Sequence, residues 1–275
     1  MIPGGERYAE RLPANIERYL RLLERHEVRC TFFTVGNVAR AYPDLVRRLV
    51  DGGHEIACHG SEHTTLDKHD AASFRRDVER CLEDFHRAGA RRVSGFRAPC
   101  GSLVPSTAWA WQVVADMGFT YSSSIVPVKH PLFGWPDFPV PPTRVEAGIW
   151  EIPVTVGGPF KLPFAAGTYF RMLPFSLVRH LMRRRMDAGE PLVGYFHPYD
   201  IDTEQERFVH PLLDDKPLMN ALMYVGRGRL LAQLERLFAE EDFEVVRYAD
   251  YVEQLNAVTS VHNGNGVSPV SVLTG

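Results

Sequence analysis

Two histidines with a glycine between them, His59 and His63, follow a short apolar run. An HxxxH pair can bind one metal ion through two imidazole nitrogens, and a catalytic zinc site has three protein ligands and an open position for water. A pair of this kind at the surface can instead make only local hydrogen bonds. Because the pair directly follows a predicted strand, we interpret it as two of the three ligands of a divalent metal, with zinc as the expected ion.

Two more polar side chains follow other predicted strands. Arg97 offers a fixed fork of donors that suits a carboxylate or a substrate oxygen, although such a residue can also form a surface ion pair. His197 carries an imidazole suited to act as a general acid, or else to bond a backbone carbonyl. Strand ends share one face in parallel α/β proteins, so we expect these four side chains to meet in one cleft.

Helical and strand periods alternate along most of the chain. The first helix is expected from Pro13, with Ile16, Leu20 and Leu23 on one face, and a strand follows at residues 30–35. Later helices are expected at residues 43–50, 73–87, 105–117, 175–187 and 216–238. Later strands are expected at residues 55–58, 93–97, 119–122, 150–154, 192–197 and 243–247. This alternation predicts a parallel sheet covered by helices.

We therefore expect the α/β class, with about seven parallel strands in a distorted (β/α) barrel that is closed or nearly closed. No glycine-rich phosphate loop follows an early strand, which argues against a dinucleotide-binding fold. The first predicted element is a helix where such a barrel begins with a strand, so a first strand is expected to be missing. We assign residues 1–257 to one domain and residues 258–275 to a flexible tail.

Composition limits the possible partners. The 275 residues have a formal net charge of -3, which gives none of the basic footprint that nucleic-acid binding requires. Four separated cysteines form no CxxC pair, so neither a structural zinc site nor a disulfide framework is expected. The chain shows no signal peptide and no membrane-spanning run, and we expect it to be cytoplasmic.

Four segments in this order resemble the motifs of NodB-like polysaccharide deacetylases, carbohydrate esterase family 4. They are residues 30–36, 53–63, 96–99 and 195–198. The resemblance extends over most of the chain, and residues 121–125, 134–137, 167–171 and 197–200 are similar to a bacterial branch found with exopolysaccharide loci.

The resemblance implies a function for each candidate residue. His59 and His63 would bind the metal, Arg97 would orient the catalytic base, and His197 would be the general acid. Three further residues would line the sugar groove: Pro99, Tyr121 and Tyr169. The implied reaction is hydrolysis of an N-acetyl group on an amino sugar in a polysaccharide or glycolipid precursor, with a carbohydrate as the partner.

The sequence departs from that family at its start. The family begins with a strand ending in an Asp-Asp motif that supplies the base and the third metal ligand, and no such motif precedes His59. Ser122 also stands where the branch has an aspartate. Either the chain as given begins after the first strand of an ordinary enzyme, or it is a non-catalytic relative that binds carbohydrate. A hydrolase of small non-sugar amides or formamides is a further alternative, because the same motifs and fold would serve it.

Overall fold

The computed structural model describes residues 11–130, 132–210, 213–240, 243–262 and 273–274. It has a strand within each of the seven ranges where the sequence predicts one. They are β1 (Thr31–Thr34), β2 (Glu55–Cys58), β3 (Gly95–Phe96), β4 (Tyr121–Ser122), β6 (Trp150–Glu151), β7 (Leu192–Val193) and β8 (Val245–Val246). Two more strands were not predicted: β5 (Thr143–Arg144) and β9 (Leu273–Thr274). The second of these falls in the segment expected to be a tail.

The strands form two sheets. The larger has the order β1-β2-β3-β4-β6-β5, and only β5 runs antiparallel to its neighbour. The smaller has the order β7-β9-β8 and is parallel. The α/β class and the mainly parallel sheet are therefore confirmed. Among the described strands no ladder joins the two sheets, and β1 is an edge strand.

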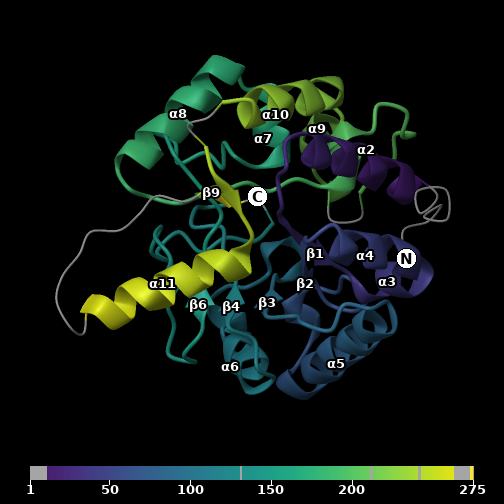
Figure 1. Cartoon of the computed structure of the whole chain (residues 1–275), viewed down its shortest axis with the longest axis vertical. Coiled ribbons are helices and arrows are strands. Elements are labelled where there is room, and N and C mark those ends of the chain that lie inside the picture. Colours follow the sequence, from purple (N-terminus) through teal and green to yellow (C-terminus); the bar gives the residue numbers. More distant parts are fainter. Residues whose placement is uncertain (1–10, 131, 211–212, 241–242, 263–272, 275) are drawn as a thin grey trace.

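Helices cover both sheets (Figure 1). Their bounds are α2 (Arg11–Arg25), α3 (Gly36–Ala41), α4 (Pro43–Asp51), α5 (Ala71–Arg87), α6 (Trp109–Asp116), α7 (Gly167–Met172), α8 (Phe175–Asp187), α9 (Pro217–Leu222), α10 (Leu230–Phe238) and α11 (Tyr248–His262). Helix α11 continues past the predicted domain boundary at residue 257. No described helix combines the length and the apolar character needed to span a membrane.

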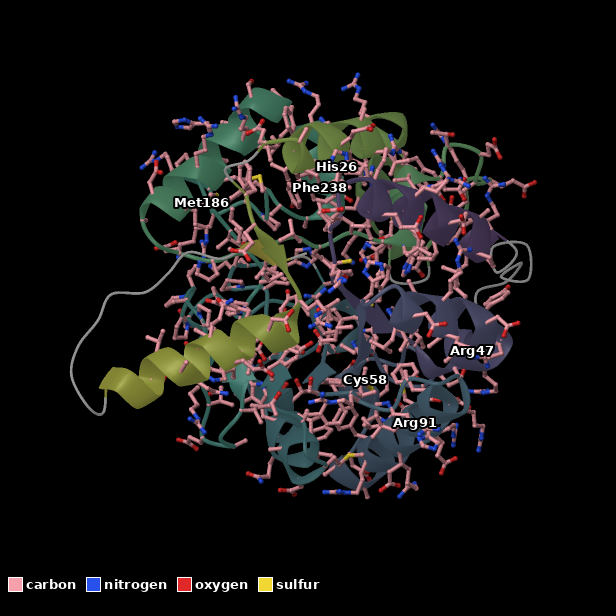
Figure 2. All side chains as sticks on the ribbon, in the orientation of Figure 1. His26, Arg47, Cys58, Arg91, Met186 and Phe238 are labelled. Carbon is pink, nitrogen blue, oxygen red and sulfur yellow. The ribbon has the colours of Figure 1, made fainter. Side chains whose placement is uncertain are left out.

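Two main hydrophobic cores hold these layers. One lies under α3 to α6 and includes Val46, Phe74 and Phe96. The other lies between α2, α7, α8 and α10. Figure 2 shows Cys58 in the interior while Arg47 and Arg91 reach the surface, which is the usual separation of apolar and charged side chains. Helix α2 contributes to both cores, so it joins the two parts of the molecule.

The prediction of a single helix at residues 216–238 is wrong. The structure has α9, a 3-10 turn η6 (Arg227–Arg229) and α10 in its place. The break falls at Gly226, which has a φ of 74°. A Cβ atom there would lie 2.6 Å from the Arg171 carbonyl oxygen, so the close approach of α7 also requires glycine.

Candidate active site

The loop after β2 carries the histidine pair. The His59 amide donates to the Thr34 carbonyl, which fixes the start of the loop against β1. His63 has a φ of 57°, an uncommon backbone conformation for a residue with a side chain. The two imidazole rings lie 4.8 Å apart between centroids. The fold therefore brings the pair together, as the spacing predicted.

The protonation of His59 is set by its surroundings. Its Nδ1 lies 2.7 Å from the Arg97 carbonyl oxygen, which can only accept, so Nδ1 carries the hydrogen and Nε2 keeps a lone pair. Burial, followed by the charge of His63, lowers the pKa of His59 well below its ordinary value. Burial is the largest cause that lowers the pKa of His63 to about 4, and the charge of His197 is the next largest. Both imidazoles are thus neutral at pH 7, as metal ligands must be.

Two imidazoles do not complete a metal site. A catalytic zinc ion takes three protein ligands, and the part of the chain that the structure describes contains no group of three His, Cys, Asp or Glu side chains placed to hold a metal. The donor types fit zinc, whereas the number of donors does not.

Arg97 is a buried cation beside these histidines, with 6% of its surface exposed. Its guanidinium donates to the Ser123 carbonyl at 2.7 Å and to the Tyr248 hydroxyl at 2.8 Å, and it lies 3.9 Å from the Phe33 ring centroid. No described carboxylate lies within ion-pair distance of it. A buried charge with only neutral partners is costly, so this position favours an anion.

His197 is held on several sides. Its Nε2 lies 2.8 Å from the Tyr195 hydroxyl, and its ring stacks on Tyr199 with centroids 4.6 Å apart. Its Nδ1 lies 3.4 Å from an Asp200 carboxylate oxygen, and its backbone amide donates to the same oxygen at 2.8 Å. The carboxylate favours a hydrogen on Nδ1, so Nε2 is the atom that accepts or delivers a proton.

Asp200 in turn pairs with a second buried cation. Arg171 lies 3.1 Å from it, and both side chains are fully buried. Burial alone raises the pKa of Asp200, but hydrogen bonding from His197 and the charges of His197 and Arg171 outweigh it and hold the pKa below its ordinary value. We did not predict roles for Asp200, Arg171 or Tyr195, although the spacing of His197 and Asp200 was a signal in the sequence.

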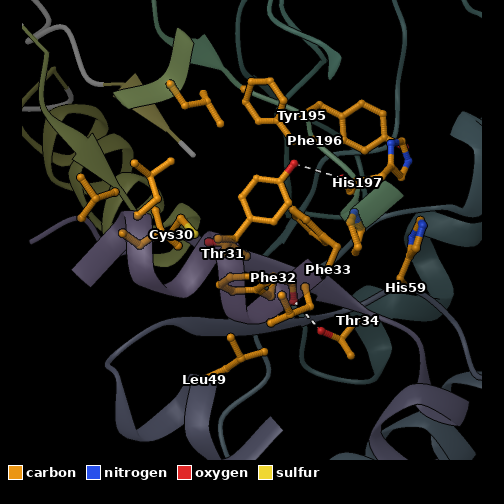
Figure 3. A pocket seen from close by; sticks show the side chains of 18 of the residues that line it. Cys30, Thr31, Phe32, Phe33, Thr34, Leu49, His59, Tyr195, Phe196 and His197 are labelled. Carbon is orange, nitrogen blue, oxygen red and sulfur yellow. Dashed lines mark hydrogen bonds between the residues drawn. The ribbon is translucent and has the colours of Figure 1, made fainter. Parts of the chain in front are cut away.

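All four predicted catalytic and metal-binding side chains line one cavity of about 340 Å³. Figure 3 shows His59 and His197 at one end of this cavity and Cys30 at the other. A second cavity, of about 380 Å³, shares His63, Arg97 and His197 with the first. The expectation that strand ends would bring these groups together is therefore met by the geometry.

The three predicted groove residues are placed differently. Tyr169 lines the second cavity. Tyr121 does not: it is fully buried, its hydroxyl donates to Glu55 at 2.8 Å, and its ring occupies the space left by Gly95, where a Cβ atom would overlap it. Pro99 is also buried and lines neither cavity. The structure thus places Tyr121 in the core rather than in the groove.

The outer edge of β1 faces the first cavity. The carbonyls of Cys30 and Thr34 accept hydrogen bonds from β2, so the backbone groups of Thr31 and Phe33 point to the other edge. All four residues of β1 line the cavity, and Tyr195 and Val245 line it as well. No strand in the described part of the chain pairs with this edge of β1, and the cavity lies between it and the smaller sheet.

Comparison with protein families gives two adjoining matches. Residues 7–122 match the model of the polysaccharide deacetylase family, and residues 123–252 match a domain of unknown function, DUF3473. The boundary falls at the end of β4, inside the larger sheet, so the two matched segments build one sheet together.

Curated relatives match about a third of the chain. The chitooligosaccharide deacetylase of Sinorhizobium fredii is 41% identical over 94 residues, which are 32% of this chain and 42% of that protein. The peptidoglycan-N-acetylglucosamine deacetylase of Bacillus cereus is 29% identical over 87 residues, which are 32% of each. These matches span less than half the length of the curated relatives.

Solved structures share the fold over most of the chain. The Puue allantoinase superposes with a TM-score of 0.61 at 16% identity, over 97% of this chain and 78% of that one. A probable polysaccharide deacetylase from Pseudomonas aeruginosa superposes with a TM-score of 0.59 at 18% identity, over 92% and 74%. The chain thus shares the α/β fold of these structures. Residues 7–122 match the polysaccharide deacetylase family model, and the residues that follow match DUF3473.

Proposed function

We propose that this protein hydrolyses the N-acetyl group of an amino sugar in a polysaccharide or glycolipid precursor, with His59 and His63 as two of the ligands of a zinc ion. One observation carries the proposal: His59, His63, Arg97 and His197 line the same cavity. Curated relatives named as deacetylases of chitooligosaccharides and of peptidoglycan N-acetylglucosamine support the choice of an N-acetylated sugar.

The proposal includes a carboxylate that the described residues do not supply. We infer that it comes from a further strand paired along the open edge of β1, which would close the sheets into a barrel. Two observations on the described residues support this placement: no strand among them pairs with the Thr31 and Phe33 side of β1, and none of their carboxylates forms an ion pair with Arg97. A carboxylate at the end of such a strand would neutralise Arg97 and join the two imidazoles.

The residues of this chain would have separate roles in the reaction. A bound zinc ion would supply a water molecule that ionises near neutral pH. His197 would protonate the departing amine from Nε2, because Asp200 holds its Nδ1 and Tyr195 marks the direction of Nε2. Tyr169 would contact the sugar from the wall of the second cavity.

A second candidate is binding of carbohydrate without cleavage. It is favoured by the incomplete ligand set, because two imidazoles bind zinc more weakly than three ligands and provide no base.

Zinc affinity and acetate release from chitooligosaccharides separate the two candidates. In the chain extended by any in-frame upstream codons, we expect acetate release that is abolished by chelation, and a His63→Ala change that weakens zinc binding by more than about tenfold. His180→Ala is the matched control, because His180 lies on α8 and lines neither cavity. Zinc-independent binding of the oligosaccharide with no acetate release, in the chain extended by any in-frame upstream codons, would favour the binding candidate.

A further inference from the structure

The second cavity has an apolar wall that the proposed chemistry does not use. Besides His63, Arg97 and His197, its lining includes Met219, Leu222 and Met223, which come from α9 and the residue that follows it. Sugar hydroxyls require hydrogen-bond partners when they leave water, and aliphatic and thioether side chains provide almost none. This wall therefore suits an apolar group.

Helix α9 presents these side chains although none of its residues is buried. It is held by backbone carbonyls at its C-terminal end and by the side chain of Asn220. The buried Arg171 guanidinium donates to the carbonyls of Leu222 and Met223, the latter at 2.9 Å. Asn220 accepts from the His210 amide at 2.9 Å and donates to the Phe208 carbonyl at 3.0 Å. Anchoring of this kind fixes the helix while its apolar side chains stay outside the core.

Exposed apolar residues gather around the same helix. Leu218 is 72% exposed and Val225 is 47% exposed, while Met172 adjoins Arg171 and Val209 lies between the two residues bonded to Asn220. These four are most of the six large, exposed hydrophobic residues in the described part of the chain. A cluster of this kind beside a cavity marks a binding surface rather than ordinary surface composition.

We propose that the substrate is a glycolipid, whose sugar reaches the histidines while the apolar chain attached to its anomeric oxygen lies against α9. This inference rests on the proposed function and selects the glycolipid from its two substrate classes. The apolar wall and the proposed proton donor are continuous, because one cavity is lined by His197 and by Met219, Leu222 and Met223. Methionine adapts its shape to flexible apolar groups, which suits an alkyl or isoprenoid chain.

Calorimetric titration with two glycosides of N-acetylglucosamine tests the proposal. The hexyl glycoside should bind at least about tenfold more tightly than the methyl glycoside, because each fully buried methylene contributes about fourfold in affinity. Met219→Gln and Leu222→Asn should each reduce this hexyl-to-methyl ratio by several fold. Both positions are partly exposed, so the variants are expected to fold, which thermal unfolding would verify.

Leu177→Asn is the matched control, because Leu177 is 42% exposed on α8 and lines neither cavity. It should leave the hexyl-to-methyl ratio unchanged. A ratio near one in the unchanged protein would overturn the glycolipid inference and leave the proposed function intact. A high ratio that persists in the Met219→Gln and Leu222→Asn variants would also overturn it, since the chain would then bind elsewhere.

Three other outcomes are informative. Tighter binding of an N-hexanoyl methyl glycoside than of the hexyl glycoside would place the apolar group on the amide, against this proposal. A dimer in solution that Leu218→Asn dissociates would assign the surface to a second copy and overturn the proposal. Failure of both glycosides to bind would instead count against the proposed function itself.

Discussion

Asp200 is the residue that ties the proposed proton donor to the core. It accepts from the His197 amide and pairs with Arg171, and none of its surface is exposed. Gly167 makes this possible, because a Cβ atom there would lie 2.1 Å from the Asp200 carboxylate. The orientation of His197 is therefore built on a buried ion pair rather than on the loop alone.

Asp200→Asn should lower the free energy of unfolding by about 3 kcal/mol, because it leaves Arg171 as a buried cation without its counter-charge. Urea unfolding at pH 7 measures this change. Asp187→Asn, at the exposed end of α8, is the control. Since the folded-state pKa of Asp200 is lowered, its contribution is present above about pH 4, the ordinary carboxyl value, and is lost as the pH falls further. A loss below about 0.5 kcal/mol at pH 7 would contradict the prediction.

His54 should make the protein sensitive to mild acid. Burial, followed by the charges of Arg29 and Arg247, lowers its pKa to about 4. The unfolded chain therefore takes up a proton near pH 6.5 while the folded chain does not, so stability is complete above that pH and is lost as the pH falls toward 4. His54→Gln should remove up to about 3 kcal/mol of this loss. Urea unfolding between pH 7 and pH 4.5 measures the free energy of unfolding of both proteins. If this free energy fell equally with pH in the two proteins, the prediction would be wrong.

At the scale of elements, β1 is the strand whose environment is unusual. It pairs with β2 on one side and faces a cavity on the other. Strand edges in native proteins are normally paired, covered or charged, and this edge is lined by apolar side chains. The open edge is the feature from which we infer a further strand.

Hydrogen exchange should distinguish the two edges of β1. The amides of Phe32 and Thr34 point toward β2, while those of Thr31 and Phe33 point toward the cavity. We expect the second pair to exchange at least about tenfold faster, because exchange of an unpaired amide does not require the ladder to open. Exchange measured by NMR residue by residue provides the test. Equal protection along β1 would mean that its outer edge is already paired.

At the scale of the whole molecule, α2 joins the two cores. Its residues Ile16 and Leu20 pack in the first core, and Tyr19 and Leu22 pack in the second. The Tyr19 hydroxyl also donates to the His197 carbonyl at 3.1 Å. Helix α2 therefore links the packing of the two halves to the position of the proposed proton donor.

Two substitutions of Tyr19 should separate its packing from its hydrogen bond. Tyr19→Phe should cost about 1 kcal/mol of stability, from the lost hydroxyl, and Tyr19→Ala about 3 to 4 kcal/mol, from the cavity left in the second core. Chemical unfolding gives both values. In both variants the NMR signals of His197 should shift, and unchanged signals would show that α2 does not position this histidine.

The sequence determined the order and position of the seven predicted strands and the residues that end them. These are local properties: β-rich runs, glycine stops and helical periods act within a few residues. The same locality explains why the histidine pair lies near Arg97, because β2 and β3 are neighbouring parallel strands whose ends share a face. His197 follows β7 of the other sheet, so only the packing of the two sheets brings it into the same cavity.

Tertiary contacts decided the rest. Tyr121 also lies on a predicted strand. Its ring is nevertheless in the core, because Gly95 leaves room for it and Glu55 accepts a hydrogen bond from its hydroxyl. The break at Gly226 depends on the approach of α7, which no local period encodes. Partners such as these are distant in the sequence, so the direction in which a side chain points, and whether a strand edge is paired, follow only from the packed molecule.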